Sequence, residues 1–243
     1  IIFMTNIEYK FHVMADVEAV SSSLSCNIVL EPSKRNTAPA VALAVKYCME
    51  KLDCGMDEIL MVLPSDHVIR PDDQFIDFLK KAGEAARNGH IVTFGIKPSR
   101  PDTGYGYIRV KAQGNRHEAI GGEEEGRVKA DYFEVEEFTE KPDLKTAEEY
   151  LKEGSYYWNS GMFAFSIDSI TKELGRYAPD IHRIFGLSFD DAARDFGALP
   201  DISLDYAVME KSDKVVTIPM DIYWNDIGSW DSIAELYERD GNG

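Results

Sequence analysis

Positive charge is scarce in this chain. It has 26 lysines and arginines against 43 aspartates and glutamates, so its formal net charge is −17. Nucleic acids and anionic membranes are bound through basic patches, and the composition therefore excludes both as partners. An acidic protein can still bind a nucleotide when a divalent cation and a few local basic groups mediate the contact.

Long apolar runs and cysteines are also few. No run approaches the roughly 18 residues that span a bilayer, and the short apolar start lacks the basic leader of a signal peptide. The three cysteines are too scattered for a disulfide framework or a zinc site. We therefore predict reduced cysteines in a cytoplasmic protein.

Several common catalytic signatures are missing as well. The sequence contains no GxxxxGK[ST] loop and no GxGxxG fingerprint. Its five histidines do not pair locally with a candidate nucleophile, so no Ser/His/Asp or Cys/His arrangement stands out. The candidate functional residues are therefore those that follow predicted strands.

The first half alternates strand-like and helix-like patterns. Such alternation predicts an α/β fold, with a mostly parallel sheet and helices on both faces. We expect strands at Ile1–Thr5, Asn27–Leu30, Ile59–Leu63 and Ile91–Ile96, and helices at Tyr9–Val20, Asn36–Met49 and Pro71–Arg87.

The second half is richer in strands and aromatic residues. Glu123-Glu124-Glu125 lies in a polar stretch that we interpret as a solvated hairpin loop. The pattern predicts one domain over the whole chain, in which a β-rich lobe is added to a nucleotide-binding sheet. We expect strands at Tyr105–Val110, Asp131–Phe138, Tyr157–Phe165 and Val215–Pro219, and helices at Asp143–Lys152, Ile167–Tyr177, Leu204–Lys211 and Trp230–Tyr237.

Two carboxylates stand at turns that follow predicted strands. Asp66 lies in Leu63–His67 and Asp226 in Trp224–Trp230. Ligands of open α/β sheets bind at the carboxyl ends of strands, and two separated carboxylates suit Mg²⁺ that also uses phosphate oxygens. Each aspartate can instead cap a turn or helix. Ser229 could cap the helix that follows Asp226 equally well.

A second pair of candidates suits a phosphorylated sugar. Glu140 ends a predicted strand and can accept hydrogens from sugar hydroxyls, while its neighbour Lys141 can neutralise phosphate. The alternative is a surface ion pair. Asn159 could also bond hydroxyls, or it could mark a strand bulge adjusted by Gly161.

Two loops offer further contacts for a ligand. Gly104 and Gly106 flank the ring of Tyr105 and would let a ligand reach main-chain amides, although a tight turn explains them equally well. The Glu31–Ala40 loop precedes a helix start, which favours an anion or a base edge. That loop can also be an N-capped connection without a ligand.

Together, these motifs occur in the order found in one known family. They run Glu31-Pro32, Arg35–Ala40, Leu63–His67, Thr103–Ile108, Phe138–Pro142, Trp158–Phe163, Ser203–Glu210 and Trp224–Trp230. In this order they resemble the mannose-1-phosphate guanylyltransferases of the sugar nucleotidylyltransferase family over nearly the whole chain.

The resemblance implies that GTP and mannose 1-phosphate give GDP-mannose and pyrophosphate. It implies Mg²⁺ on Asp66 and Asp226, and the sugar phosphate on Lys141. It assigns residues 1–100 to the nucleotide side and 101–243 to the sugar-phosphate side. Glu140, Asn159 and the Gly104–Gly106 segment with Tyr105 would bind the sugar, and the Glu31–Ala38 loop with Arg35, Asn36 and Thr37 would receive guanine.

Three alternatives stay open: a different hexose 1-phosphate, a different nucleotide, or a non-catalytic regulatory or partner subunit. The oligomeric state is also open, a homodimer included. The family begins with a strand and a glycine-rich loop that clamps the triphosphate, and Ile1–Asn6 resembles the strand after that unit. The resemblance therefore implies a domain incomplete at its N-terminus.

We expect residues 1–243 alone to be inactive, because the triphosphate clamp supplies the electrostatic stabilisation on which such transfers depend. Pyrophosphate release from GTP, mannose 1-phosphate and Mg²⁺ measures this. Normal turnover by this polypeptide would contradict the expectation.

Overall fold

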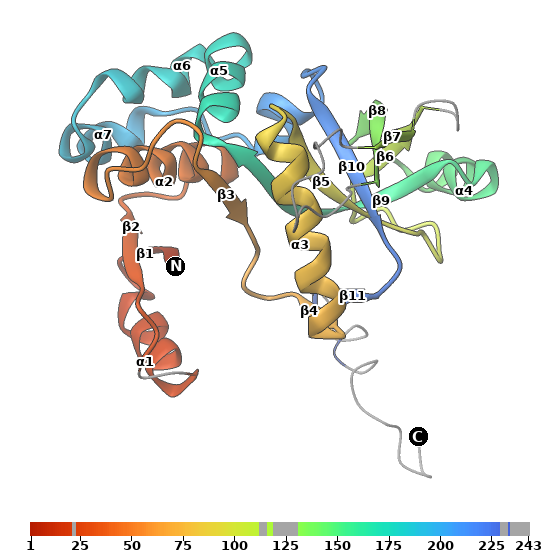
Figure 1. Cartoon of the computed structure of the whole chain (residues 1–243), viewed down its shortest axis with the longest axis horizontal. Coiled ribbons are helices and arrows are strands. Elements are labelled where there is room, and N and C mark those ends of the chain that lie inside the picture. Colours follow the sequence, from red (N-terminus) through yellow and green to blue (C-terminus); the bar gives the residue numbers. More distant parts are fainter. Residues whose placement is uncertain (21–22, 112–115, 119–130, 229–232, 234–243) are drawn as a thin grey trace. The chain divides into compact units, whose positions relative to one another are not determined.

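A computed structural model describes residues 1–20, 23–111, 116–118, 131–228 and 233 (Figure 1). The chain forms two compact units, each made from two segments. The first unit joins residues 1–58 to 167–212, and the second joins 59–166 to 213–243. The assignment of 1–100 to the nucleotide and 101–243 to the sugar phosphate stays a prediction.

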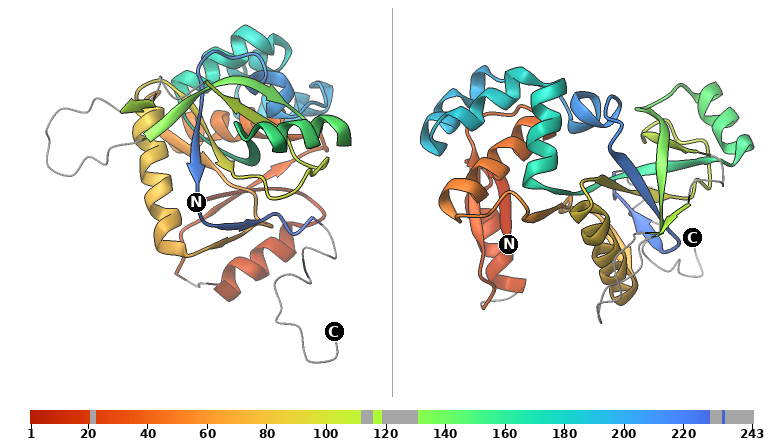
Figure 2. Two further views of the ribbon diagram at one scale, coloured as in Figure 1. Left: turned by 90° about the vertical axis from the view of Figure 1, so that its right-hand side faces the viewer. Right: turned by 45° about the horizontal axis from the view of Figure 1, so that its top comes forward.

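The first unit contains a parallel two-stranded ladder. Strands β1 (Ile2–Asn6) and β2 (Asn27–Glu31) pair in register, with helix α1 (Lys10–Val20) between them in sequence. Helix α2 (Thr37–Lys51) packs against both strands, as Figure 2 shows. The side chain of Asn36 caps α2 by accepting the amide of Thr37 at 2.9 Å.

The rest of the first unit is helical. The predicted helix α5 (Ile167–Tyr177) is confirmed, and the expected helix at Leu204–Lys211 is a shorter π-helical segment, η3 (Asp205–Met209). The residues between them form four short helices that were not predicted, and the first three pack on α2. These are α6 (Pro179–His182), η1 (Arg183–Gly186), α7 (Phe189–Asp195) and η2 (Phe196–Ala198).

The second unit is built on a seven-stranded sheet. Its order is β10-β5-β9-β6-β8-β7, with β3 also pairing with β9. The strands are β3 (Ile59–Val62), β5 (Ile91–Ile96), β6 (Tyr107–Val110), β7 (Arg116–Glu118), β8 (Asp131–Thr139), β9 (Tyr156–Ser166) and β10 (Val215–Met220).

Strand pairing in this sheet is mixed. β5 and β10 are parallel, whereas β9 runs antiparallel to β3, β5 and β6. Within the described residues, the expected parallel character is therefore confined to β5–β10 here and to β1–β2 in the first unit. The sheet is mixed because the long strand β9, from the β-rich half of the sequence, lies between β3 and β5 and pairs antiparallel with both.

Helices cover the sheet and enclose its core. α3 (Asp72–Arg87) packs on β3, β5, β9 and β10 (Figure 1), and its predicted apolar face meets a cluster that includes Phe94, Met162 and Ile218. The predicted helix α4 runs from Leu144 to Glu153. Asp143 is its N-cap, and its side chain accepts the amide of Thr146. A separate antiparallel ladder joins β4 (Val68–Arg70) to β11 (Tyr223–Asn225).

Two expectations fall outside the described residues. They are the loop with Glu123-Glu124-Glu125 and, apart from Ile233, the helix at Trp230–Tyr237.

The fully buried ring of Phe94 predicts a large cost on truncation. Phe94→Ala should lower the free energy of unfolding by about 3–5 kcal/mol, since it leaves a cavity in the sheet core. The control Ile76→Ala changes a side chain on α3 that is 51% exposed, and it should cost under about 0.5 kcal/mol. Urea unfolding compares them, and equal costs would contradict this account of the core.

Candidate functional site

The β4–β11 ladder brings the two predicted metal carboxylates to one place in the second unit. Val68 pairs with Asn225 in antiparallel register. Asp66 lies two residues before Val68, and Asp226 follows Asn225 directly. In an antiparallel ladder the start of one strand adjoins the end of the other, so both carboxylates lie at the same end.

His67 follows Asp66 directly and interacts electrostatically with the carboxylates of Asp66 and Asp226. Its Nδ1 accepts the indole N–H of Trp224 at 3.2 Å, and the two rings meet edge to face. Burial lowers the pKa of His67, while the charges of Asp66 and Asp226 oppose that shift. A neutral imidazole that accepts from a tryptophan fits a structural role for this histidine.

Tyr105 lies beside Asp226, and its hydroxyl makes a hydrogen bond there. It donates to Oδ1 of Asp226 at 2.9 Å. Burial raises the pKa of Tyr105, as do its hydrogen bond and proximity to Asp226, so the phenol stays protonated and can donate. The contact of Tyr105 with the sugar stays a prediction, and the structure shows its hydroxyl bonded to Asp226, a predicted metal ligand.

Three predicted sugar-binding residues gather around the start of β6. The amide of Asn159 donates to the carbonyl of Gly106 at 2.8 Å. A Cβ on Gly106 would lie 2.5 Å from Oε2 of Glu140 and 3.4 Å from Cβ of Asn159. The missing side chain at Gly106 therefore leaves the space that Glu140 occupies.

Lys141 and Gly104 flank this group. Lys141 has a φ of 48° and places its ammonium 3.5 Å from Glu140, with its side chain 62% exposed. It is thus available to an anion from solvent. Gly104 is exposed and donates its amide to the side chain of Asp102 at 2.9 Å, which holds the turn that precedes Tyr105.

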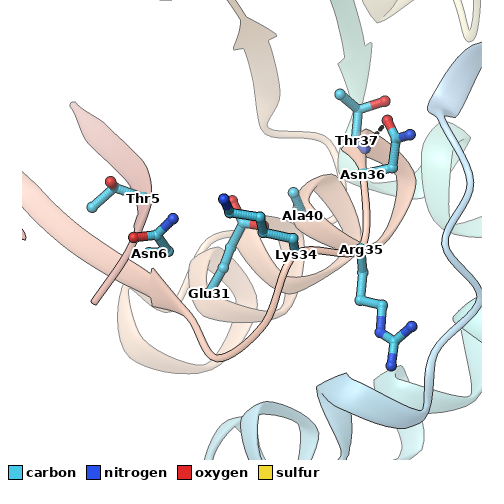
Figure 3. A pocket seen from close by; sticks show the side chains of 8 residues that line it. All are labelled: Thr5, Asn6, Glu31, Lys34, Arg35, Asn36, Thr37 and Ala40. Carbon is cyan, nitrogen blue, oxygen red and sulfur yellow. Dashed lines mark hydrogen bonds between the residues drawn. The ribbon is translucent and has the colours of Figure 1, made fainter. Parts of the chain in front are cut away.

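The first unit carries a separate cavity of about 330 Å³, within the range of small-molecule sites (Figure 3). All four residues predicted to receive the base line it. The full lining is Thr5, Asn6, Glu31, Lys34, Arg35, Asn36, Thr37 and Ala40.

Contacts within the first unit fix the loop that borders this cavity. The guanidinium of Arg35 donates to the carbonyl of Gly197 and points away from Glu31 and Lys34 (Figure 3). The hydroxyl of Thr37 accepts the amide of Leu204 at 2.8 Å. Asn36 caps α2 with a φ of 65°. These three side chains thus shape the cavity wall.

Glu31 is the acidic group of the cavity lining. It stands at the end of β2, and burial raises its pKa. Burial disfavours the charged form of this carboxyl, and hydrogen bonds donated by a ligand would stabilise that form.

Some site residues were not predicted. Thr5 and Asn6 line the cavity, and the rule that ligands meet strand ends would have pointed to Asn6. Thr93 is buried in β5 and donates to Oδ1 of Asn159 at 2.8 Å. No local pattern could have shown a bond between residues so far apart in sequence.

A comparison with protein families decides the broader assignment. The profile of the nucleotidyl transferase family matches residues 1–242. This chain belongs to the nucleotidyl transferase family.

Curated relatives of this nucleotidyl transferase support a closer grouping. It is 42% identical to a mannose-1-phosphate guanylyltransferase from Salmonella montevideo and 41% identical to the xanthan biosynthesis protein XanB from Xanthomonas campestris pv. campestris (strain B100). Each alignment covers 100% of this chain and 50% of the relative. The chain thus spans about half the length of the curated relatives it matches.

A solved structure confirms the fold expected from the sequence. The crystal structure of mannose-1-phosphate geranyltransferase from Thermus thermophilus matches this nucleotidyl transferase with a TM-score of 0.79 and 30% identity. The match covers 98% of this chain and 64% of that chain. The Rossmann-like α/β class is therefore confirmed.

The His, Cys, Asp and Glu side chains of the described residues do not form a preassembled metal cluster. Over the residues that the structure describes, no three His, Cys, Asp or Glu side chains converge as one. Two carboxylates that share a cation with phosphate oxygens would not form such a cluster. Within the same described ranges, no helix has the length and apolarity to cross a membrane.

The partly buried Glu31 predicts a gain in stability when its charge is removed. Burial makes the folded chain hold this proton more tightly than the unfolded chain, so stability falls as pH rises above the ordinary value of 4.5. Glu31→Gln should raise the urea midpoint near pH 7, and the gain should shrink toward about pH 4.

Glu50→Gln is the matched control, because it should change the urea midpoint in the opposite direction. Glu50 accepts the amide of Phe189 at 2.7 Å, and this bond is the main cause that lowers its pKa. Its amide variant should lower the midpoint near pH 7. A Glu31→Gln midpoint at or below that of the unmodified chain would contradict the burial argument.

Proposed function

We propose that this chain forms the catalytic core of a mannose-1-phosphate guanylyltransferase. The reaction transfers the guanylyl group of GTP to mannose 1-phosphate and gives GDP-mannose and pyrophosphate. The names of relatives about 40% identical over the full chain support it, as does the family membership. A cytoplasmic location and a homodimer stay predictions.

The observation that carries the proposal is the meeting of Asp66 and Asp226 at one end of the β4–β11 ladder. Both offer hard carboxylate oxygens, and Mg²⁺ takes one or two carboxylates together with substrate phosphates. The donor set therefore fits Mg²⁺. When bound, Mg²⁺ would neutralise charge on the phosphates during transfer.

The cavity of the first unit suits a guanine base. Guanine presents N–H donors at N1 and N2, and the carboxylate of Glu31 is an acceptor in that cavity. Adenine presents an acceptor at N1, which a carboxylate does not match. The ammonium of Lys34, also in the lining, can meet phosphate or the guanine O6 acceptor.

The second unit supplies the groups for the sugar phosphate. Glu140 and Asn159 can hydrogen-bond the sugar hydroxyls beside Gly106, and the exposed Lys141 can hold the phosphate. A phosphate oxygen of mannose 1-phosphate attacks the α-phosphorus of GTP, and the bond to the pyrophosphate oxygen breaks. Such a transfer depends on positioning and charge neutralisation and needs no covalent enzyme intermediate.

The proposal predicts that the two carboxylates are essential. Asp66→Asn and Asp226→Asn should each lower kcat by about 10²–10³-fold or more, as loss of one electrostatic group at a transfer site does. Asp221→Asn is the control, because Asp221 is exposed and lies close to β11 in sequence. It should keep activity within about twofold.

The assay is pyrophosphate release from GTP and mannose 1-phosphate with Mg²⁺, on the longest polypeptide that carries residues 1–243. Wild-type activity with either asparagine variant would overturn the metal assignment. No activity with mannose 1-phosphate, combined with activity on another hexose 1-phosphate, would overturn the substrate assignment.

A further inference from the structure

The carboxylate of Asp226 is held by one of its two oxygens. Oδ1 accepts the hydroxyl of Tyr105 at 2.9 Å and the amide of Gly228 at 3.2 Å. Within the described part of the chain, no hydrogen bond or ion pair reaches Oδ2. A cation would therefore meet a carboxylate with a single oxygen left to coordinate it.

Aromatic packing fixes the hydroxyl of Tyr105. Its ring lies 5.0 Å from that of Trp158 and 5.4 Å from that of Trp224, measured between centroids. Trp158 is buried in β9, and Trp224 in β11 is itself bonded to His67. The phenol thus cannot turn away from Asp226 without repacking two indole rings.

Backbone geometry fixes the second donor. Ile227 has a φ of 49°, which is strained for a β-branched residue, and its amide donates to the side chain of Asn225 at 2.8 Å. This turn carries the amide of Gly228 back to Oδ1. A Cβ on Gly228 would lie 3.0 Å from Oδ2 of Asp226, so the glycine leaves the unbonded oxygen uncrowded.

We propose that Tyr105 is a positioning residue that holds Asp226 as a one-oxygen ligand for a divalent cation. The inference rests on the proposed role of Asp226 in metal binding. A one-oxygen ligand suits Mg²⁺, which demands near-octahedral geometry at short distances. Ca²⁺ accepts bidentate carboxylates and irregular geometry, so the arrangement favours Mg²⁺ over Ca²⁺.

The substitution Tyr105→Phe keeps the ring and removes the hydroxyl. Oδ1 then becomes available, and the carboxylate can turn and coordinate through both oxygens. We expect the dissociation constant for Mg²⁺ to rise by about tenfold, the lower end of what loss of a group that orients a metal ligand costs. We expect the constant for Ca²⁺ to rise less, so that the preference for Mg²⁺ narrows.

The measurement is the electron paramagnetic resonance of Mn²⁺ with a non-hydrolysable GTP analogue, with Mg²⁺ or Ca²⁺ as competitor. It needs no turnover, and it uses the longest polypeptide that carries the chain. Tyr223→Phe is the control, because Tyr223 lies in β11 and is 43% exposed. It should match the unmodified protein for both ions.

Three outcomes separate the inference from the proposed function. If Asp226→Asn leaves cation affinity unchanged, the proposed metal site is wrong. If Asp226→Asn weakens it but Tyr105→Phe leaves either the Mg²⁺ affinity or the Mg²⁺-to-Ca²⁺ preference unchanged, the role of Tyr105 is overturned. If Tyr105→Phe weakens Mg²⁺ binding and also narrows the preference for Mg²⁺ over Ca²⁺, the positioning role of Tyr105 is supported.

Should Tyr105→Phe fail to fold, Gly228→Ala tests the same carboxylate from its other side. The added methyl would crowd Oδ2 and should weaken Mg²⁺ binding as well. Unchanged Mg²⁺ affinity in Gly228→Ala would then overturn the proposal.

Discussion

The proposed chemistry depends on a short antiparallel ladder in the second unit. β4 and β11 are three residues each and come from opposite ends of that unit's sequence. Their pairing fixes where Asp66 and Asp226 leave the backbone. Two carboxylates close together repel one another, and a bound cation relieves that repulsion. The ladder thus links the strand register to the proposed metal site.

Backbone strain is concentrated in the predicted motifs. Four non-glycine residues in the described chain have a positive φ, and three of them are Asn36, Lys141 and Ile227. Each lies in a turn that carries a predicted ligand group. Unfavourable backbone geometry persists where surrounding contacts hold it, and it is common at ligand-binding turns. This distribution agrees with the sites inferred from motif order.

Local patterns predicted the elements better than their contacts. The bounds of α5 and the start of α2 near Asn36 followed from apolar spacing and capping chemistry. The helices between Pro179 and Ala198 are seven residues or shorter, too brief to show a helical period. The bond from Tyr105 to Asp226 spans 121 residues, and no local signal encodes it.

The central claim is that Asp66 and Asp226 together hold a divalent cation. Anomalous diffraction from crystals grown with Mn²⁺ and a guanine nucleotide tests it most directly. The account predicts a manganese peak in direct contact with a carboxylate oxygen of Asp66 and with Oδ2 of Asp226. A peak that does not contact both carboxylates would contradict it.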